Sequence, residues 1–188
     1  MTSPLRILGL GGSVRADSHN KRLLELTLEM AREHGADIRL ADVHSMRLPI
    51  FDPELPAHEQ PQQLHTLIAS MQWADGFVLC SPTYLGSLSG AVKNMLDSLH
   101  LAHGEPRVYF EGRPVMLASY GYYGQRHTIR SLDFVARVMG ADVLPESLAI
   151  TGDEAIDGEQ TLSSALVQAQ MRSAVTYLMQ ATEVSLRR

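Results

Sequence analysis

One segment of this 188-residue chain reads Gly9-Leu10-Gly11-Gly12-Ser13-Val14-Arg15-Ala16-Asp17-Ser18-His19-Asn20. It follows a short apolar run and precedes a helical periodicity, so we expect a turn from a strand into a helix. Backbone N–H groups at a helix N-terminus point outward, with the positive end of the helix dipole behind them. Ser13, Ser18 and Asn20 add neutral donors, and Arg15 adds a charged one. The segment therefore predicts a phosphate site.

The spacing of the glycines indicates which kind of phosphate this turn suits. A dinucleotide-binding turn requires G-x-G-x-x-G, and counting from Gly9 places Val14 where the third glycine belongs. A P-loop ends in Gly-Lys-Ser or Gly-Lys-Thr, which occurs nowhere in the chain. A hydroxyl-rich turn suits a phosphate monoester, such as the one that ends the ribityl chain of FMN in flavodoxin-like folds. The alternative is an ordinary helix start capped by serine or asparagine.

Composition and charge limit the classes of partner. The chain has 45% hydrophobic and 20% charged residues, as expected of one globular domain over residues 1–188. A net charge of −5 argues against nucleic acid and anionic membrane partners. The single cysteine, Cys80, excludes an internal disulfide and fits the reducing cytoplasm, where we expect the protein. His100 and His103 have no third ligand nearby, so we expect no metal site.

Strand and helix patterns alternate along the whole chain. Apolar runs predict five strands, at residues 5–10, 38–43, 76–80, 114–119 and 142–150. Helical patterns are found at residues 19–34, 62–73 and 88–101, in the segment that ends at residue 140, and at residues 159–179. A proline-rich surface loop is expected at residues 45–61. This alternation predicts an α/β fold, a doubly wound five-stranded parallel sheet of order 2-1-3-4-5 with helices on both faces. In that order the loops after the first, third and fourth strands converge at one sheet edge.

The loop after the third strand reads Ser81-Pro82-Thr83-Tyr84-Leu85-Gly86-Ser87-Leu88-Ser89-Gly90. Pro82 fixes one backbone angle, while Gly86 and Gly90 permit close approach of a ligand. Tyr84 offers a flat aromatic surface. Such a loop can lie along a planar heterocycle and present backbone N–H groups to the N5 and O4 edge of a flavin. The alternative is a tight turn before a helix.

The loop after the fourth strand reads Ser119-Tyr120-Gly121-Tyr122-Tyr123-Gly124-Gln125. Its two glycines suit contact with the pyrimidine end of a flavin ring. Its three tyrosines are also typical of an oligomer interface, which Leu85 and Leu88 on the neighbouring loop would extend. The chain carries no recognisable nucleophile or acid–base constellation, which suits a reaction whose chemistry belongs to a cofactor.

Two motifs make the chain resemble a known family. Residues 12–23 match the pattern G-S-x-R-x-x-S-x-N-x-x-L, and residues 81–94 match [ST]-P-x-Y-x-G-S-x-x-G-x-x-K-N. Both patterns are those of the NADPH-dependent FMN reductase family, which has a flavodoxin-like fold. The resemblance covers about residues 5–177. It departs in the third loop, where Tyr122 and Tyr123 precede Gly124 instead of a glycine pair.

The resemblance implies a cofactor site and an activity. The expected cofactor-binding residues are Ser13, Arg15, Ser18, His19, Asn20, Pro82, Thr83, Tyr84, Leu85, Gly86, Ser119 and Gly121. Of these, Ser13, Arg15, Ser18 and Asn20 would hold the phosphate, and Pro82, Thr83, Tyr84 and Gly86 would lie beside the ring. The implied reaction is hydride transfer from NADPH, with NADH as an alternative donor, to FMN. The reduced flavin is then released, for instance to a monooxygenase partner, or passes electrons to an acceptor such as a quinone. A homodimer or homotetramer is implied, and a flavodoxin-like electron carrier or a non-catalytic flavin-binding protein is the alternative.

Overall fold

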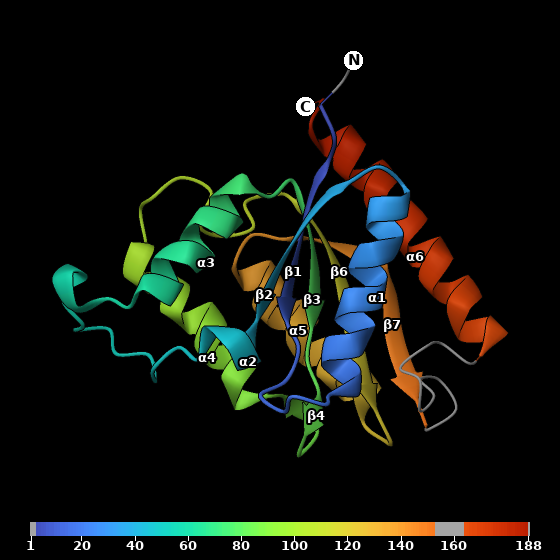
Figure 1. Ribbon diagram of the computed structural model, residues 1–188, viewed down its shortest axis with the longest axis horizontal. Coiled ribbons are helices and arrows are strands. Elements are labelled where there is room, and N and C mark those ends of the chain that lie inside the picture. Colours follow the sequence, from blue (N-terminus) through green and yellow to red (C-terminus); the bar gives the residue numbers. More distant parts are fainter. Residues whose placement is uncertain (1–2, 153–163, 188) are drawn as a thin grey trace.

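The structure is a computed structural model that describes residues 3–152 and 164–187. Its strands are β1 Arg6–Gly11, β2 Asp37–Asp42, β3 Gly76–Cys80, β4 Thr83–Tyr84, β5 Ser87–Leu88, β6 Pro114–Gly121 and β7 Asp142–Thr151. Its α-helices are α1 His19–Glu33, α2 Val43–Met46, α3 Gln62–Trp73, α4 Gly90–Ser98, α5 Gln125–Val138 and α6 Ala165–Ser185 (Figure 1). Two 3₁₀ turns cover Ala57–Glu59 and Leu99–Ala102.

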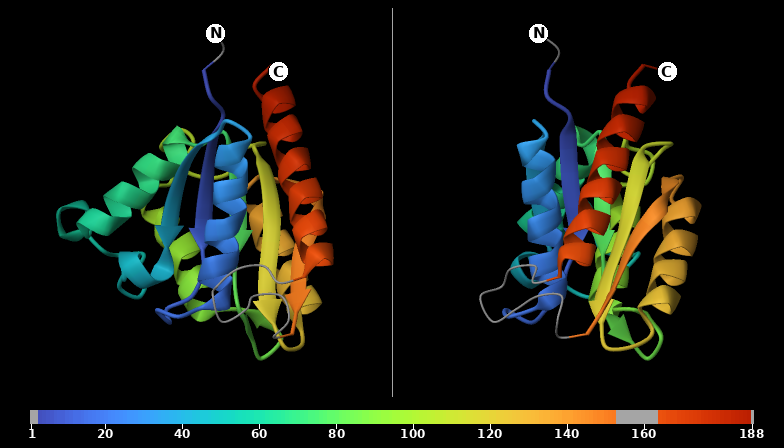
Figure 2. Two further views of the ribbon diagram at one scale, coloured as in Figure 1. Left: turned by 45° about the vertical axis from the view of Figure 1, so that its right-hand side comes forward. Right: turned by 90° about the vertical axis from the view of Figure 1, so that its right-hand side faces the viewer.

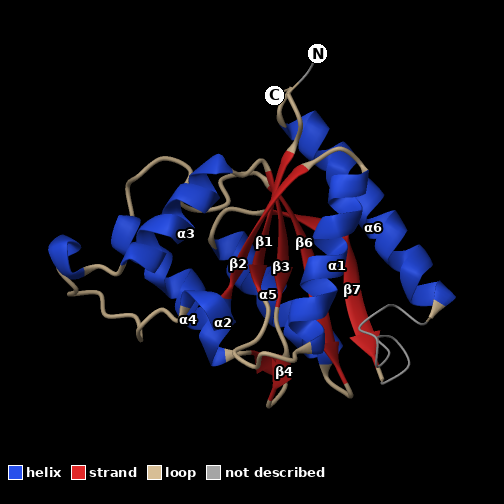
Figure 3. Cartoon of the chain, viewed as in Figure 1, coloured by secondary structure: helices blue, strands red, loops and turns tan. Residues whose placement is uncertain are grey.

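Five of these strands form one parallel sheet of order β2-β1-β3-β6-β7 (Figure 3). The predicted order is confirmed, since β6 and β7 are the fourth and fifth expected strands. The short strands β4 and β5 pair with each other in a separate hairpin. All five residues of β3 are buried, as expected for a central strand of a sheet that is covered on both faces.

Helices cover both faces of the sheet, which is confirmed as a doubly wound α/β arrangement (Figure 2). One core joins the sheet to α1 and α6, with Leu24 and Leu178 among its buried residues. The other core joins the sheet to α3, α4 and α5, and there Phe77 and Phe110 meet edge to face at 4.9 Å. Helix α1 crosses β1 closely, because a Cβ at Gly9 would lie 2.6 Å from a methyl group of Leu28. The positions of the helices thus follow from the apolar periodicity of each segment.

Several element boundaries differ from the expectation. The helix predicted at 88–101 begins at Gly90, because Ser87 and Leu88 pair with β4. Residue 43, expected in a strand, instead begins the short helix α2, which Asp42 caps by accepting a hydrogen bond from the His44 N–H at 3.2 Å. The helix predicted at 159–179 is described as α6 from Ala165 to Ser185, and residues 159–163 lie outside the described residues. No described helix is both long and apolar enough to span a bilayer.

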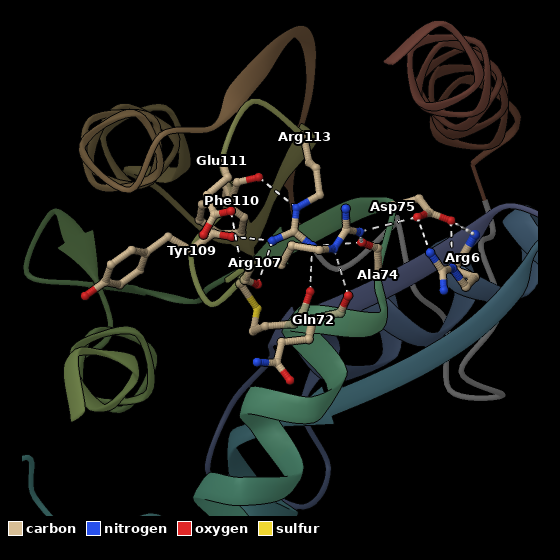
Figure 4. A network of polar contacts seen from close by, with 10 residues as sticks. Arg6, Gln72, Ala74, Asp75, Arg107, Tyr109, Phe110, Glu111 and Arg113 are labelled. Atoms are coloured by element: carbon tan, nitrogen blue, oxygen red, sulfur yellow. Dashed lines mark hydrogen bonds and ion pairs between the residues drawn. The ribbon is translucent and has the colours of Figure 1, made fainter. Parts of the chain in front are cut away.

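The amino ends of the strands are held by buried Arg113, whose side chain is 5% exposed (Figure 4). Its guanidinium donates hydrogen bonds to five backbone carbonyl oxygens, those of Met71, Ala74, Arg107, Tyr109 and Phe110. Burial, followed by the nearby positive charge of Arg107, lowers the pKa of the Arg113 guanidinium to about 10.

Two further arginines, Arg6 and Arg107, extend this cluster around Asp75. Arg6 grips the Asp75 carboxylate through two nitrogens at 2.9 and 2.7 Å, and Arg107 reaches it at 3.4 Å. These contacts tie β1, the turn before β3 and the loop before β6 together. The three predicted loops follow β1, β3 and β6 at the opposite edge of the sheet.

Candidate functional site

The first loop leaves β1 through two glycines in the left-handed region, Gly11 at φ +109° and Gly12 at φ +76°. A Cβ on Gly11 would lie 2.0 Å from the carbonyl oxygen of Cys80, so only glycine fits there. The Gly12 N–H donates a hydrogen bond of 2.9 Å to the same oxygen. The loop is therefore fixed to the carboxyl end of β3 before it turns into α1.

The start of α1 has hydrogen-bonding groups without partners among the residues that the structure describes. Ser18 is the N-cap residue, yet its side chain makes no capping hydrogen bond, and the first turn contains no acidic residue. Ser13 is buried, and its hydroxyl accepts a hydrogen bond of 3.3 Å from the Arg15 N–H. Within the described chain, the exposed Arg15 guanidinium has no ion-pair partner. A hydroxyl and a guanidinium beside the positive end of a helix suit an anion.

Asn20 is directed away from this loop and toward β6. Its side chain is 5% exposed, its Nδ2 donates to the Tyr120 carbonyl at 2.9 Å, and its Oδ1 accepts from the Tyr120 N–H at 2.8 Å. The Cys80 thiol donates to the Asn20 carbonyl at 3.4 Å. Burial raises the pKa of the Cys80 thiol well above its ordinary value, which fits a core residue and not a nucleophile. Asn20 thus joins the first loop to the third.

The second loop is a hairpin whose two-residue turn, Leu85-Gly86, has positive φ at both positions, +50° and +79°. Leu85 is fully exposed, and an L-residue in this region costs about 1–2 kcal/mol. A Cβ on Gly86 would meet no atom within 4 Å, so the space beside this glycine is open. Tyr84 is half exposed beside the turn.

Hydroxyl groups hold the hairpin against the sheet and α5. The Thr83 hydroxyl lies 2.8 Å from that of Thr128 and 3.4 Å from that of Ser119. The Thr128 hydroxyl also donates to the Ser87 carbonyl at 3.2 Å. Ser119 and Thr128 are fully buried, so both act as supports of the hairpin within the chain.

The third loop presents two tyrosines to solvent and not three. Tyr120 is 3% exposed, meets the His19 ring edge to face at 4.7 Å, and donates from its hydroxyl to the Gly152 carbonyl. The expected surface role of Tyr120 is therefore wrong, because its side chain completes the core between α1 and β7. Tyr122 and Tyr123 are 63% and 84% exposed.

The three loops enclose a cavity of about 310 Å³ at the carboxyl edge of the sheet. It is lined by Ser13, Arg15, Asp17, Ser18, His19, Asn20, Pro82, Thr83, Tyr84, Tyr120, Gly121 and Tyr122. Leu85, Gly86 and Ser119 of the expected set do not line it. Three further residues line the cavity that the sequence did not predict, namely Asp17, Tyr120 and Tyr122. Of these, Asp17 could have been predicted, because it lies inside the first motif. Among the described residues no group of three metal-ligating side chains occurs.

The fold and this edge cavity define a flavodoxin-like α/β protein. The family model for NADPH-dependent FMN reductase matches residues 5–155, and the chain belongs to this family. It is accordingly an oxidoreductase, of a family that uses FMN and NAD(P)H.

Similar proteins agree with this assignment. An NAD(P)H-dependent FMN reductase of Pseudomonas aeruginosa is 28% identical over 141 residues, covering 72% of this chain and 73% of that protein. An NAD(P)H:quinone oxidoreductase of Solanum tuberosum is 26% identical over 121 residues, covering 64% and 61%. Among solved structures, the flavoenzyme NAD(P)H:(acceptor) oxidoreductase of Paracoccus denitrificans superposes with a TM-score of 0.81 at 19% identity, covering 96% of this chain and 98% of that one. This last likeness concerns the fold.

Proposed function

We propose that this protein transfers hydride from NADPH, with NADH as an alternative donor, to FMN held in the cavity of the three loops. The observation that carries the proposal is the start of α1. There Ser18 and Arg15 line the cavity, and neither the Ser18 hydroxyl nor the Arg15 guanidinium has a partner among the described residues. The N–H groups of a helix start that no side chain caps bond to water or to a ligand. A phosphate monoester at the end of a ribityl chain is such a ligand.

The first loop is assigned to the phosphate. Ser13 and Ser18 would donate from their hydroxyls, Arg15 would supply the charge, and the first N–H groups of α1, near His19, would complete the cradle. Asn20 is included through its hold on the Tyr120 backbone, which keeps the first and third loops at a fixed separation.

The second and third loops are assigned to the ring. Pro82, Thr83 and Tyr84 line one part of the cavity, and Gly121 and Tyr122 line another. Leu85 and Gly86 form the turn of the hairpin and do not line the cavity. Ser119 supports Thr83 through the contact between their hydroxyl groups. When bound, FMN supplies the ring that accepts hydride from the nicotinamide. We assign no side chain as a catalytic acid or base, and the role of the chain is to bind and orient the two partners.

The electrons then leave by one of two routes. Reduced flavin dissociates, which would serve a monooxygenase partner, or it passes electrons to an acceptor such as a quinone. The name of the Solanum tuberosum relative supports the quinone route. The free buried thiol of Cys80 is compatible with a cytoplasmic enzyme, and the single sheet supports treating residues 1–188 as one FMN-binding domain.

Steady-state oxidation of NADPH and NADH, with added FMN, FAD, riboflavin or a quinone, tests the proposal. We expect continuous NADPH consumption that depends on FMN. A protein that binds FMN but never consumes NADPH or NADH would be an electron carrier or a non-catalytic flavin-binding protein. The acceptor that gives the highest kcat/KM identifies the route of the electrons.

We also propose that the protein is a homodimer or homotetramer whose interface lies beside the cavity. Leu85, Tyr122 and Tyr123 are exposed on adjacent loops, and exposed aromatic and apolar side chains in one place are typical of interfaces. Sedimentation at micromolar concentration should give a particle larger than one chain, and Tyr122→Ala with Tyr123→Ala should shift it toward the monomer. A fully active monomer of 20.7 kDa would contradict this proposal.

A further inference from the structure

A second cavity, of about 540 Å³, is lined by residues of α5, of α6 and of the outer edge strand β7. Its polar lining comprises Arg126, Arg130, Glu146, Ser147, Gln170 and Ser173. We refer to this cavity as the edge groove. Its two arginines are on the first turns of α5, the helix that follows the third loop of the candidate site. Nothing in the assignment of the flavin site makes use of the edge groove.

The two arginines are arranged in a way that is electrostatically unfavourable for the chain alone. Arg126 and Arg130 are four residues apart on one helix face, where like charges repel. They also lie near the positive end of the helix dipole, and the first turn of α5 contains no acidic residue. Within residues 3–152 and 164–187, neither guanidinium has an ion-pair or hydrogen-bond partner. Later on the same helix, by contrast, Arg137 is paired with Asp133 at 2.9 Å.

The remaining polar groups of the edge groove leave this positive charge in excess. The Glu146 carboxylate accepts a hydrogen bond of 3.1 Å from the Ser173 hydroxyl. Two arginines and one glutamate leave the edge groove with a net charge of +1. Hydroxyl and amide groups of Ser147 and Gln170 line it as further donors. Paired guanidinium groups with neutral donors are the chemistry that recognises a phosphate dianion.

A short stretch of chain connects the candidate flavin site to the edge groove, since Tyr122 lines the first and Arg126 lines the second. Arg126 follows Gly124 by two residues, and a Cβ on Gly124 would lie 3.1 Å from the side chain of Thr83 in the cavity wall. Tyr122, on the same short loop, lines the flavin cavity. The adenosine half of a dinucleotide whose nicotinamide reaches the flavin ring would have to extend past this loop to reach the edge groove.

We propose that Arg126 and Arg130 bind the 2′-phosphate on the adenosine half of NADPH and so determine the preference for NADPH over NADH. The inference rests on the proposed function, because it assumes that NADPH is the hydride donor at the flavin cavity. The 2′-phosphate places its charge between two guanidinium groups that otherwise repel each other. NADH carries a ribose hydroxyl at that position and does not relieve the repulsion.

The test compares the wild-type holoprotein with the double variant Arg126→Gln with Arg130→Gln and with Arg137→Gln as a matched control on the same helix. Calorimetry with 2′,5′-ADP, 5′-AMP and inorganic phosphate separates the 2′-phosphate from other sources of the same charge. We expect the double variant to bind 2′,5′-ADP about 10- to 100-fold more weakly. Binding of 5′-AMP should change little, and Arg137→Gln should match wild type for all three probes.

Steady-state kinetics provide the second readout. The ratio of kcat/KM for NADPH to that for NADH should fall at least tenfold in the double variant, with FMN affinity unchanged. Equal affinity of wild type and double variant for 2′,5′-ADP, or a phosphate effect as large as that of 2′,5′-ADP, would overturn the inference. If no variant oxidises either nucleotide, the proposed function fails, while the calorimetric comparison still decides whether the edge groove binds a 2′-phosphate.

Discussion

The two edges of the parallel sheet use arginine in opposite ways. At the amino edge, Arg113 is buried and gives its hydrogen bonds to five carbonyl oxygens of the chain (Figure 4). At the carboxyl edge, Arg15 is exposed, lines a cavity, and has no ion-pair partner among the described residues. The first arrangement satisfies every donor internally and stabilises the fold. The second leaves the Arg15 donors without a partner in the chain as described, so that they are available to hydrogen-bond a ligand.

The largest expected effect concerns the amino edge. Arg113→Met removes five side-chain hydrogen bonds to backbone carbonyl groups, and we expect the free energy of unfolding to fall by about 3–5 kcal/mol. Unfolding in urea measures this loss of free energy. The matched variant Arg15→Met at the opposite edge should change stability by less than about 0.5 kcal/mol. A similar loss in both variants would show that the two edges do not differ as described.

Asn20→Ala should have the next largest effect, because it breaks the link between the first and third loops. It removes two buried hydrogen bonds to the Tyr120 backbone, which costs about 2–4 kcal/mol of stability. FMN and riboflavin should lose affinity by the same factor. A selective loss of FMN affinity would show instead that Asn20 contacts the phosphate directly.

Asn94→Ala is the control for that variant. Asn94 also bridges backbone groups, with bonds of 2.8 Å to the Pro49 carbonyl and to the Phe51 N–H. It joins α4 to a loop outside the flavin cavity. Its loss should lower stability and leave the affinity for FMN and riboflavin unchanged.

Arg15→Ala tests the open donors of the carboxyl edge. If its guanidinium is paired with the phosphate, FMN binding should weaken by about 1.5–3 kcal/mol, or roughly 10- to 150-fold. Riboflavin, which lacks the phosphate, should bind as before, and the unfolding curve should not move. Unchanged FMN affinity in this variant would mean that Arg15 faces solvent in the complex.

The last comparison concerns two glycines, one near each edge. Gly86 and Gly35 both have positive φ, at +79° and +88°, and a Cβ on either would meet no atom within 4 Å. Valine at each should cost about 1–2 kcal/mol through backbone strain alone. Only Gly86→Val should also lower reductase turnover, because the same hairpin carries Thr83 and Tyr84 of the cavity wall, and an NADPH oxidation assay measures this. Normal turnover in that variant would show that the hairpin is only a turn.

Much of the fold was predictable because its signals are local. The apolar runs and helical periodicities set the strand order, and the two glycine-bearing motifs placed the first two loops at one edge. The hairpin was not predicted, because a two-residue turn with positive φ normally carries Asn-Gly and here carries Leu85-Gly86.

The roles of side chains whose partners are distant in the sequence could not be predicted from local patterns. Asn20 looks like a phosphate donor in its motif, and its partner Tyr120 lies 100 residues away. Tyr120 itself was expected at the surface with Tyr122 and Tyr123, yet it packs on His19. The five acceptors of Arg113 are backbone atoms whose convergence no spacing reveals.

The central claim is that the turn from Ser13 to Ser18 addresses a flavin phosphate. The most direct measurement is the affinity of the wild-type protein for FMN and for riboflavin, by calorimetry or by quenching of flavin fluorescence. The account predicts that FMN binds at least tenfold more tightly, because only FMN engages the helix start and Arg15. Equal affinity for the two flavins would contradict it.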